Sequence, residues 1–437
     1  MLSSELFIQN LQAGVKPATG CTEPIAVAFA AANCMAHLED SQIEAIDVQV
    51  SPNVMKNAMA VMVPGIGEPG LAVAAATGAL AGNYTAGLDV IASIPAASIP
   101  KIKTLAHSGK VQAGIAPVED DLYVEVGIRS LSGEVRVYIA GSHTNIYRIE
   151  KNGQRIVDLA RPASHAVSEL KLGMQQATFK QVWDFALQIP LDQIAFMQQA
   201  DTLNVALAKA GLQEQYGLQL GQSIQRAKAD VLGGTGTDLQ ETIMAYTAAA
   251  SDARMGGAPL PAMSNSGSGN QGITATVPVS MVARHIGATD EQLIRAQTLS
   301  HLTAIYIHAF LPVLSAFCAT DSAAMGAAAG IVYLLGHDYE RACMAIKNMT
   351  GDAPGMVCDG AGCSCAMKVA TSTSSMYRAV NLALQGVVIP ATNGLVCEDI
   401  DETIHGIGIL GTKGMKETDP AVLEVMMNKR MKVQLAK

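Results

Sequence analysis

The sequence has little charge and few aromatic residues. Of its 437 residues, 15% are charged, 4% are aromatic and one is tryptophan, while 49% are hydrophobic. A chain of this composition can bury enough apolar surface to offset its ordering entropy, which excludes intrinsic disorder. An excess of positive charge is also absent, because 29 Lys and Arg face 38 Asp and Glu. Proteins that bind the nucleic-acid backbone carry basic stripes, so we expect no nucleic-acid partner.

A long apolar run is absent as well. The least charged stretch, residues 296–320, contains His301, His308 and Pro312, whereas a spanning helix needs about 20 predominantly apolar residues. We therefore predict a buried core helix there and no membrane partner. The first ten residues have neither the basic start nor the apolar core of a secretion signal, so we expect a cytoplasmic protein. Cytoplasmic thiols stay reduced, which leaves the eight cysteines as metal ligands, catalytic groups or core residues.

Two patterns divide the chain. The first third has alternating, β-branched segments typical of strands at residues 43–50, 122–129 and 134–140. A small-residue run at 72–82 predicts a closely packed helix, and a polar, irregular stretch at 150–174 predicts a connection. Nearly everything after that stretch has a helical pattern. We predict an α+β protein, with an N-terminal mixed α/β domain at 1–170 and a larger all-α domain at 171–437.

The segment GMVCDGAGCSCAMKV, at 355–369, places Cys358, Cys363 and Cys365 among glycines, and Cys318 lies 40 residues before the first of them. Thiolates select zinc or iron–sulfur centres, so this group suggests a soft-metal site. Its spacing matches no pair of zinc-knuckle CxxC motifs and only approaches that of a ferredoxin. Spacing alone therefore names no metal, and redox thiols or core packing remain open.

Near the N-terminus, KPATGCTEP places Cys21 just before a helix that Pro24 can begin. A helix N-terminus favours the thiolate form, so Cys21 is a candidate reactive residue. The loop glycines of KNAMAVMVPGIG, at 56–67, could bring Lys56 and Asn57 to a pocket. His143 follows a predicted strand and is either an acid–base group or a structural histidine.

The segment MSNSGSGNQG, at 263–272, has glycines in GxGxxG register, but no strand is predicted before it. Without a βαβ frame that register is weak as a dinucleotide motif. We predict instead that polar side chains and backbone N–H groups ahead of a helix hold a substrate carboxylate, with a tight glycine-rich turn as the alternative. The residues concerned are Ser264, Asn265, Ser266, Gly267, Gly269 and Asn270.

Together, KPATGCTEP, KNAMAVMVPGIG, SNSGSGNQG and the cysteine group resemble the L-cysteine desulfidase family, relatives of iron–sulfur L-serine dehydratases, over most of the chain. The resemblance implies a 4Fe-4S cluster held by Cys318, Cys358 and Cys365, with the choice between Cys363 and Cys365 left open, and with one iron free for substrate. It also implies conversion of L-cysteine to pyruvate, hydrogen sulfide and ammonia. Cys21 matches the family's catalytic cysteine and would remove the α-proton.

Three other interpretations remain. An L-serine dehydratase would use the same cluster and expel hydroxide instead of sulfide. A metal- or thiol-sensing protein would bind without turnover. A pyridoxal-phosphate lyase would use Lys368, but no phosphate cradle accompanies that lysine. For all the enzyme interpretations the partner is a small amino acid, and a homodimer is the expected assembly because symmetric dimers are the commonest oligomers.

Overall fold

The computed structural model describes residues 4–163, 168–230 and 238–435. The chain forms two compact units, and each contains more than one stretch of sequence. The α/β unit comprises Ala18–Ala166, Asp359–Gly362 and Glu417–Lys437, and the helical unit comprises Met1–Pro17, Val167–Cys358 and Cys363–Lys416. The predicted fold class, a mixed α/β region followed by a helical one, is confirmed. The predicted domain division at residue 170 stays a prediction.

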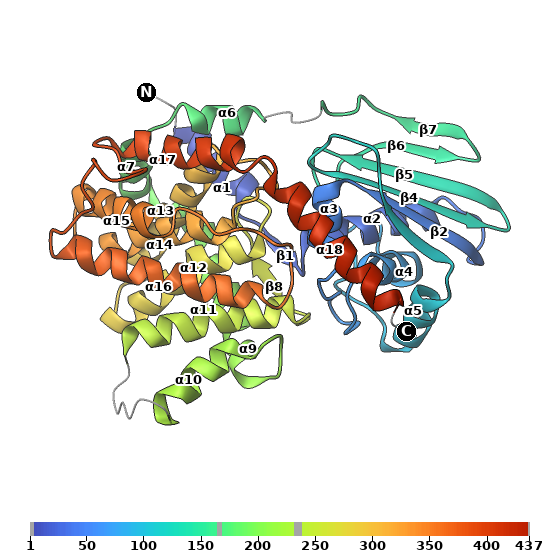
Figure 1. Ribbon diagram of the computed structural model, residues 1–437, viewed down its shortest axis with the longest axis horizontal. Coiled ribbons are helices and arrows are strands. Elements are labelled where there is room, and N and C mark those ends of the chain that lie inside the picture. Colours follow the sequence, from blue (N-terminus) through green and yellow to red (C-terminus); the bar gives the residue numbers. More distant parts are fainter. Residues whose placement is uncertain (1–3, 164–167, 231–237, 436–437) are drawn as a thin grey trace. The chain divides into compact units, whose positions relative to one another are not determined.

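A six-stranded mixed sheet forms the centre of the α/β unit (Figure 1), in the order β3-β2-β4-β5-β6-β7. Strand β2 pairs in parallel with β3 and antiparallel with β4, and the pairs from β4 to β7 are all antiparallel. The strands are β2 (Ile43–Val50), β3 (Val111–Ile115), β4 (Tyr123–Ser130), β5 (Gly133–Ala140), β6 (Ile146–Lys151) and β7 (Gln154–Asp158). The helices are α2 (Thr22–Ala36), α3 (Pro52–Ala58), α4 (Leu71–Ala81), α5 (Ile99–His107) and α18 (Thr418–Leu435), with short 3-10 turns η1 (Gly87–Asp89) and η2 (Ala96–Ser98).

Helix α2 packs on one face of the sheet, against β4 and β5, and α4 packs against α2. Alternation along the strands buries one set of apolar side chains beneath α2, including Val126 and Val137, which lie opposite each other in register. The small-residue run predicted as a closely packed helix forms α4. Its Gly78 touches the α2 backbone, since a Cβ at that position would lie 2.0 Å from the carbonyl oxygen of Ala28. Only glycine permits this approach.

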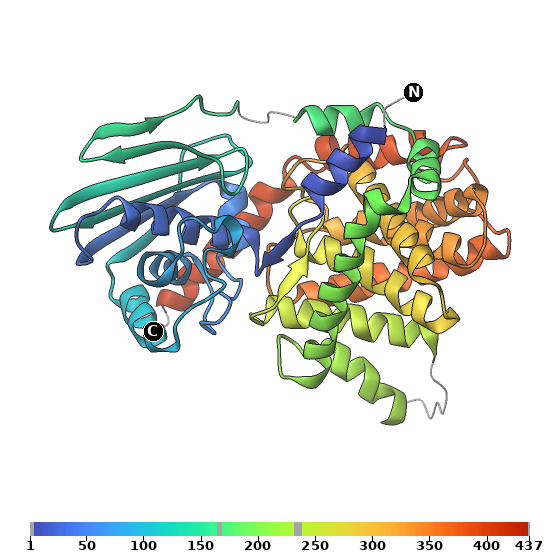
Figure 2. The ribbon, with the colours of Figure 1, turned by 180° about the vertical axis from the view of Figure 1, so that it is seen from behind.

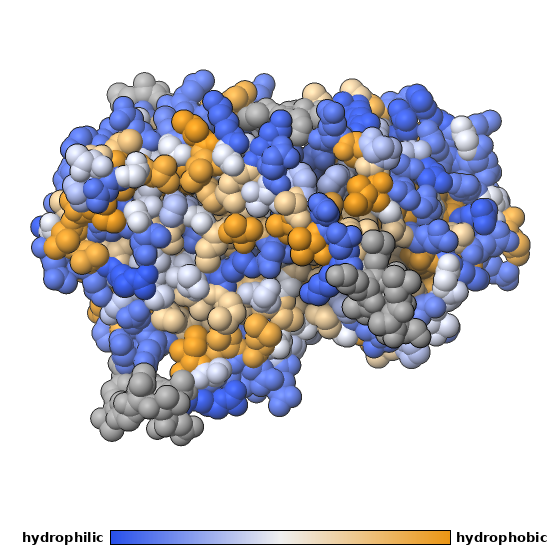
Figure 3. Space-filling view, in the orientation of Figure 1, coloured by the Kyte–Doolittle hydropathy of each residue, from blue (hydrophilic) through white to orange (hydrophobic). Residues whose placement is uncertain are grey.

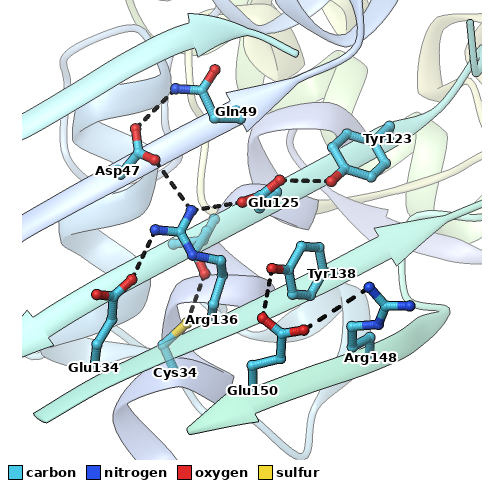
Figure 4. Close-up of polar contacts among 11 residues, drawn as sticks. Cys34, Asp47, Gln49, Tyr123, Glu125, Glu134, Arg136, Tyr138, Arg148 and Glu150 are labelled. Atoms are coloured by element: carbon cyan, nitrogen blue, oxygen red, sulfur yellow. Dashed lines mark hydrogen bonds and ion pairs between the residues drawn. The ribbon is translucent and has the colours of Figure 1, made fainter. Parts of the chain in front are cut away.

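The opposite face of the sheet is polar (Figure 4). Arg136 lies at its centre, with Nη1 2.6 Å from Glu125 Oε1 and Nη2 2.8 Å from Glu134 Oε1. Gly127 lies opposite Arg136 in register, and a Cβ there would come within 3.0 Å of the guanidinium. The missing side chain thus leaves room for Arg136 to lie across the sheet. The face is held by ion pairs, each of which contributes little by itself because its members are partly exposed.

The helical unit packs its helices around a single large apolar core. Helices α12, α13 and α14 are buried along almost their whole length. Figures 1 and 2 show them among the other helices of this unit. Figure 3 shows small apolar patches among polar residues on one face of the molecule. The first elements are α1 (Ser4–Gly14), α6 (Glu169–Gln175), α7 (Phe179–Gln188), α8 (Leu191–Ile194), η3 (Ala195–Met197), α9 (Gln198–Gln213), α10 (Leu220–Asp230) and α11 (Leu239–Met255). The remainder are β8 (Pro261–Met263), α12 (Gly269–Ile286), α13 (Asp290–His308), α14 (Ala319–Leu334), α15 (Tyr339–Asp352), α16 (Cys365–Leu384), α17 (Ile400–Ile409) and a π-helical turn η4 (Leu410–Gly414), and the short strand β1 (Pro17–Thr19) lies at the boundary between the two units.

Two local expectations need correction. The buried helix predicted over 296–320 ends at His308, and α14 begins only at Ala319, because Pro312 cannot continue a helix. The polar stretch that starts at residue 150 holds the end of β6 and all of β7, whose exposed edge position tolerates polar residues. Within the described residues, no helix combines the length and the apolar character needed to cross a lipid bilayer.

Candidate functional site

The helical unit brings together three cysteines that are distant in sequence. Phe317 and Val357 form an isolated antiparallel bridge. On either side of it, the Cys318 N–H donates to the Met356 carbonyl at 2.7 Å and the Cys358 N–H donates to the Ala316 carbonyl at 2.8 Å. This short ladder places Cys318 opposite Met356 and Cys358 opposite Ala316, so the two cysteines lie diagonally across the bridge.

Two of these cysteines stand where helices begin. Cys318 is the N-cap of α14, and Cys365 is the first residue of α16. A helix N-terminus carries partial positive charge and stabilises an anion nearby, with an effect of about 0.3–1 kcal/mol per site. Both helices thus favour negative charge on sulfur in this part of the unit.

Electrostatic coupling shows that the thiols interact. Burial raises the pKa of Cys318, and the charges of Asp321, Cys358 and Cys365 raise it further. Cys363 has different neighbours: burial and the Asp252 charge raise the pKa of its thiol, and its Sγ lies 3.9 Å from the Met255 carbonyl. The thiol grouped with Cys318 and Cys358 is therefore that of Cys365.

In the described part of the chain, no three His, Cys, Asp or Glu side chains are placed so that they could hold a metal ion. The three cysteines are near enough to interact but do not surround one point. A cluster of several irons takes each cysteine on a different iron, so its ligands are spaced more widely than those of a single ion. The donor set, three thiols beside two helix N-termini, matches the chemistry of an iron–sulfur cluster with one iron left open.

The predicted carboxylate cradle forms a tight turn before α12. The Ser264 N–H and Oγ donate to the Lys16 carbonyl at 2.8 and 2.6 Å, and the Ser266 N–H donates to the Gly14 carbonyl at 2.9 Å. Ser251 Oγ donates to the Asn270 side chain at 3.2 Å. Several of the turn's polar groups are thus bound by the chain itself, while the amides of Gly269 and Asn270 stand in the first turn of α12.

The glycines of this turn have steric reasons to be glycine. Gly267 has a φ of +83°, and a Cβ on Gly269 would lie 2.1 Å from Arg254 Nε. A Cβ on Gly272 would lie 2.0 Å from the Met263 carbonyl. Contrary to expectation, a strand does precede the turn, but β8 has three residues and is no part of a βαβ frame.

Asn265 links this turn to a buried histidine. Its Nδ2 donates to His301 Nδ1 at 3.1 Å and to the His301 carbonyl at 3.0 Å. His301 Nε2 lies 2.9 Å from Thr276 Oγ1, which itself donates to the Gly272 carbonyl. The imidazole therefore accepts at Nδ1 and donates at Nε2, as a neutral ring does. Burial lowers the pKa of His301 to about 3.

The α/β unit holds a second polar group, around Glu23. Cys21 is the N-cap of α2, so the helix predicted from Pro24 begins two residues earlier, at Thr22. Cys21 Sγ donates to Glu23 Oε2 at 3.0 Å, and Thr22 Oγ1 donates to the same oxygen at 3.1 Å. Asn57 Nδ2 donates to Glu23 Oε1 at 3.0 Å. Cys21 is thus a thiol hydrogen-bonded to a buried carboxylate.

The other predicted residues of this unit have clear positions. Lys56 is buried, and its Nζ lies 2.6 Å from Asp419 of α18. His143 follows β5, as predicted, and interacts electrostatically with Glu23. The substrate-binding role predicted for Lys56 and the acid–base role considered for His143 stay predictions.

Sequence reasoning gave no role to two acidic residues. Glu23 is the centre of the Cys21 group, and its place two residues after the candidate cysteine was the available signal. Asp321 accepts the Met356 N–H at 2.9 Å and the Ser372 hydroxyl at 2.8 Å. Burial raises the pKa of Asp321 to about 7. The only indication of this role in the sequence is that Asp321 lies three residues after Cys318.

Comparison with known proteins gives consistent matches. The family model described as "Serine dehydratase alpha chain" matches residues 151–424. A "UPF0597 protein" of Latilactobacillus sakei subsp. sakei is 66% identical over 98% of this chain and 100% of the relative. A "UPF0597 protein" of Chromobacterium violaceum is 48% identical over 97% of both chains, and "UPF0597 protein YhaM" of Salmonella gallinarum is 46% identical over 97% of both.

We predict that His301 makes stability fall in mild acid. Its pKa is about 3 in the folded protein and 6.5 when unfolded, so between these values the unfolded chain binds a proton that the folded chain does not. The free energy of unfolding then decreases as pH falls below 6.5, by about 1.4 kcal/mol per pH unit from this group. The variant His301→Gln keeps a hydrogen-bond acceptor and a donor but does not titrate. Its free energy of unfolding should therefore fall by about 1.4 kcal/mol less per pH unit than that of the wild type.

Urea unfolding at pH 7, 6 and 5 measures this difference. The same substitution at exposed His337 serves as the control and should keep the wild-type slope. Equal slopes for wild type and His301→Gln would show that His301 is solvated or protonated in the folded protein.

Proposed function

Because the chain belongs to the serine dehydratase alpha chain family, we propose that it is a lyase that removes the β-substituent of a small L-amino acid, with L-cysteine as the substrate. The products are pyruvate, hydrogen sulfide and ammonia. The observation that carries the proposal is the grouping of Cys318, Cys358 and Cys365, with Cys318 and Cys365 at the start of helices α14 and α16. These residues would hold a 4Fe-4S cluster.

When bound by Cys318, Cys358 and Cys365, a cluster with an open iron would supply a Lewis acid for the departure of the β-substituent. The protein's own groups must bind the amino acid and move its α-proton. As a base removes that proton, the electrons of the C–H bond form the Cα–Cβ double bond and those of the C–S bond leave with sulfide. Aminoacrylate is released and takes up water to give pyruvate and ammonia, so atoms and electrons balance.

Cys21 is the proposed base. Its sulfur must first lose its own proton to solvent, and the hydrogen bond that Glu23 accepts from it at 3.0 Å holds the sulfur in place. The N-terminus of α2 stabilises the negative charge that then resides on sulfur. The start of α12, at Gly269 and Asn270, is the proposed second contact for the substrate carboxylate.

L-Serine is the second candidate substrate, and the description of the matching family favours it. Hydroxide is a poorer leaving group than sulfide, so the choice depends on how strongly the site stabilises the departing atom. We place either reaction in the cytoplasm, where cysteine thiols stay reduced and able to bind iron.

The proposed activity is tested under anaerobic conditions after iron and sulfide have been supplied to the full-length protein. We expect equal amounts of sulfide and pyruvate from L-cysteine, together with the visible absorption of the cluster. Faster pyruvate release from L-serine would assign the dehydratase reaction instead. A clear cluster spectrum with no product from either amino acid would show that the proposed lyase activity is wrong.

The third ligand is tested with a matched pair of variants. Cys365→Ser should lose bound iron, the visible absorption and more than about tenfold of the activity, because one iron then lacks its thiolate. Cys363→Ser should keep all three, since the Cys363 thiol lies by the Met255 carbonyl and is influenced by the Asp252 charge instead. The reverse pattern of iron content would assign the ligand to Cys363.

The role of Cys21 is tested by Cys21→Ala. Loss of a general base should lower kcat by about 10²–10⁴-fold, while iron content and visible absorption stay at the wild-type level. Cys34→Ala is the control, because Cys34 is a buried thiol of the same helix whose Sγ donates to the Val126 carbonyl. Full turnover by Cys21→Ala with its cluster intact would remove Cys21 from the mechanism.

A further inference from the structure

Glu23 differs from two other buried acids of the chain, Asp120 and Asp201, in having no arginine or lysine partner. Asp120 is paired with Arg161 at 2.7 Å, and Asp201 is paired with Arg284 at 2.8 Å. Glu23 is 5% exposed, and in the described residues it forms no ion pair with a lysine or an arginine. A buried carboxylate is costly unless a positive charge or enough hydrogen bonds compensate it. A positive charge bound beside Glu23 would therefore stabilise this carboxylate.

The carboxylate is nevertheless ionised at neutral pH. Burial tends to raise the pKa of Glu23, but His143 and the hydrogen bonds from Cys21 and Asn57 outweigh it, and the net shift is downward. Burial lowers the pKa of His143, and the Glu23 charge opposes that shift. The position of Glu23 in the first turn of α2 adds to its stabilisation as an anion.

Two polar atoms beside this carboxylate are buried and have no hydrogen-bond partner. They are Asn57 Oδ1 and His143 Nε2. Asn57 donates to Glu23 through Nδ2, which leaves Oδ1 as an acceptor. A neutral imidazole can accept at Nε2 when its proton is on Nδ1. Buried polar groups are almost always paired in folded proteins, so two orphaned atoms around one carboxylate point to a missing donor.

A primary ammonium group supplies the positive charge and the hydrogen-bond donors that Glu23, Asn57 and His143 lack. It carries one positive charge and three N–H donors, which match one carboxylate and two neutral acceptors. The other polar groups of a small amino acid fit worse, since a carboxylate would be repelled by Glu23 and a hydroxyl or thiol has a single donor. We propose that Glu23, Asn57 and His143 form the subsite that binds the α-ammonium group of the substrate. This inference rests on the proposed function and specifies α-amino acids, rather than hydroxy acids, as its substrates.

The test is direct binding of two ligands that cannot lose a β-substituent. L-Alanine has the ammonium group, and L-lactate has a hydroxyl in its place. Isothermal titration calorimetry on the cluster-loaded, full-length protein should show L-alanine binding at least 10-fold more tightly than L-lactate. Glu23→Gln removes the charge but keeps the shape, and it should weaken L-alanine at least 10-fold while L-lactate changes less than 2-fold.

Asp120→Asn is the matched control, because it neutralises a buried acid of the same unit that already has an arginine partner. It should leave both affinities unchanged. Asn57→Ala keeps Glu23 and removes the orphaned Oδ1, and it should weaken L-alanine by about 3- to 10-fold, which provides a second test if Glu23→Gln does not fold.

Two results would overturn the subsite: equal affinity of the wild type for both ligands, or wild-type L-alanine binding by a folded Glu23→Gln or Asn57→Ala. These results are independent of turnover. If the wild type releases neither sulfide nor pyruvate but binds L-alanine through Glu23, the proposed reaction is wrong and the ammonium subsite stands.

Discussion

The attraction between negative charge and the N-terminal end of a buried helix determines the chemistry of both units. In the helical unit Cys318 caps α14 and Cys365 begins α16. In the α/β unit Cys21 caps α2, with Glu23 in its first turn. A helix N-terminus carries partial positive charge, which favours negative charge on the sulfur and carboxylate groups beside it.

Close helix packing keeps these N-termini in place. A Cβ on Gly326 would lie 2.2 Å from the Ser300 carbonyl, and one on Gly330 would lie 2.7 Å from that of Ala296, so α14 touches the backbone of α13. Gly78 joins α4 to α2 in the same way. Because small residues remove the side-chain layer, the helices approach to backbone contact and their ends are fixed by many dispersion contacts. A cysteine at the N-terminus of such a helix is therefore held in position by a rigid helix and not by a loop.

The supply of hydrogen-bond partners differs between the His301 imidazole and the groups around Glu23. Asn265 and His301 satisfy each other within the helical unit, and the depressed pKa of His301 is the consequence of that burial. Around Glu23 the supply is incomplete, because Asn57 Oδ1 and His143 Nε2 have no partner. Two unpaired atoms beside one buried carboxylate are a place where a ligand with several donors gains hydrogen bonds.

The sequence by itself determined the fold class, the strands at 43–50 and 134–140, the helix of small residues and the candidate cysteines, because these depend on local periodicity and on residue chemistry. It did not distinguish Cys363 from Cys365, since both lie in one glycine-rich segment and only the direction of α16 separates them. The importance of Glu23 was hidden for a similar reason. Its partners Asn57 and His143 are 34 and 120 positions away, and only tertiary packing brings their unpaired atoms to one carboxylate.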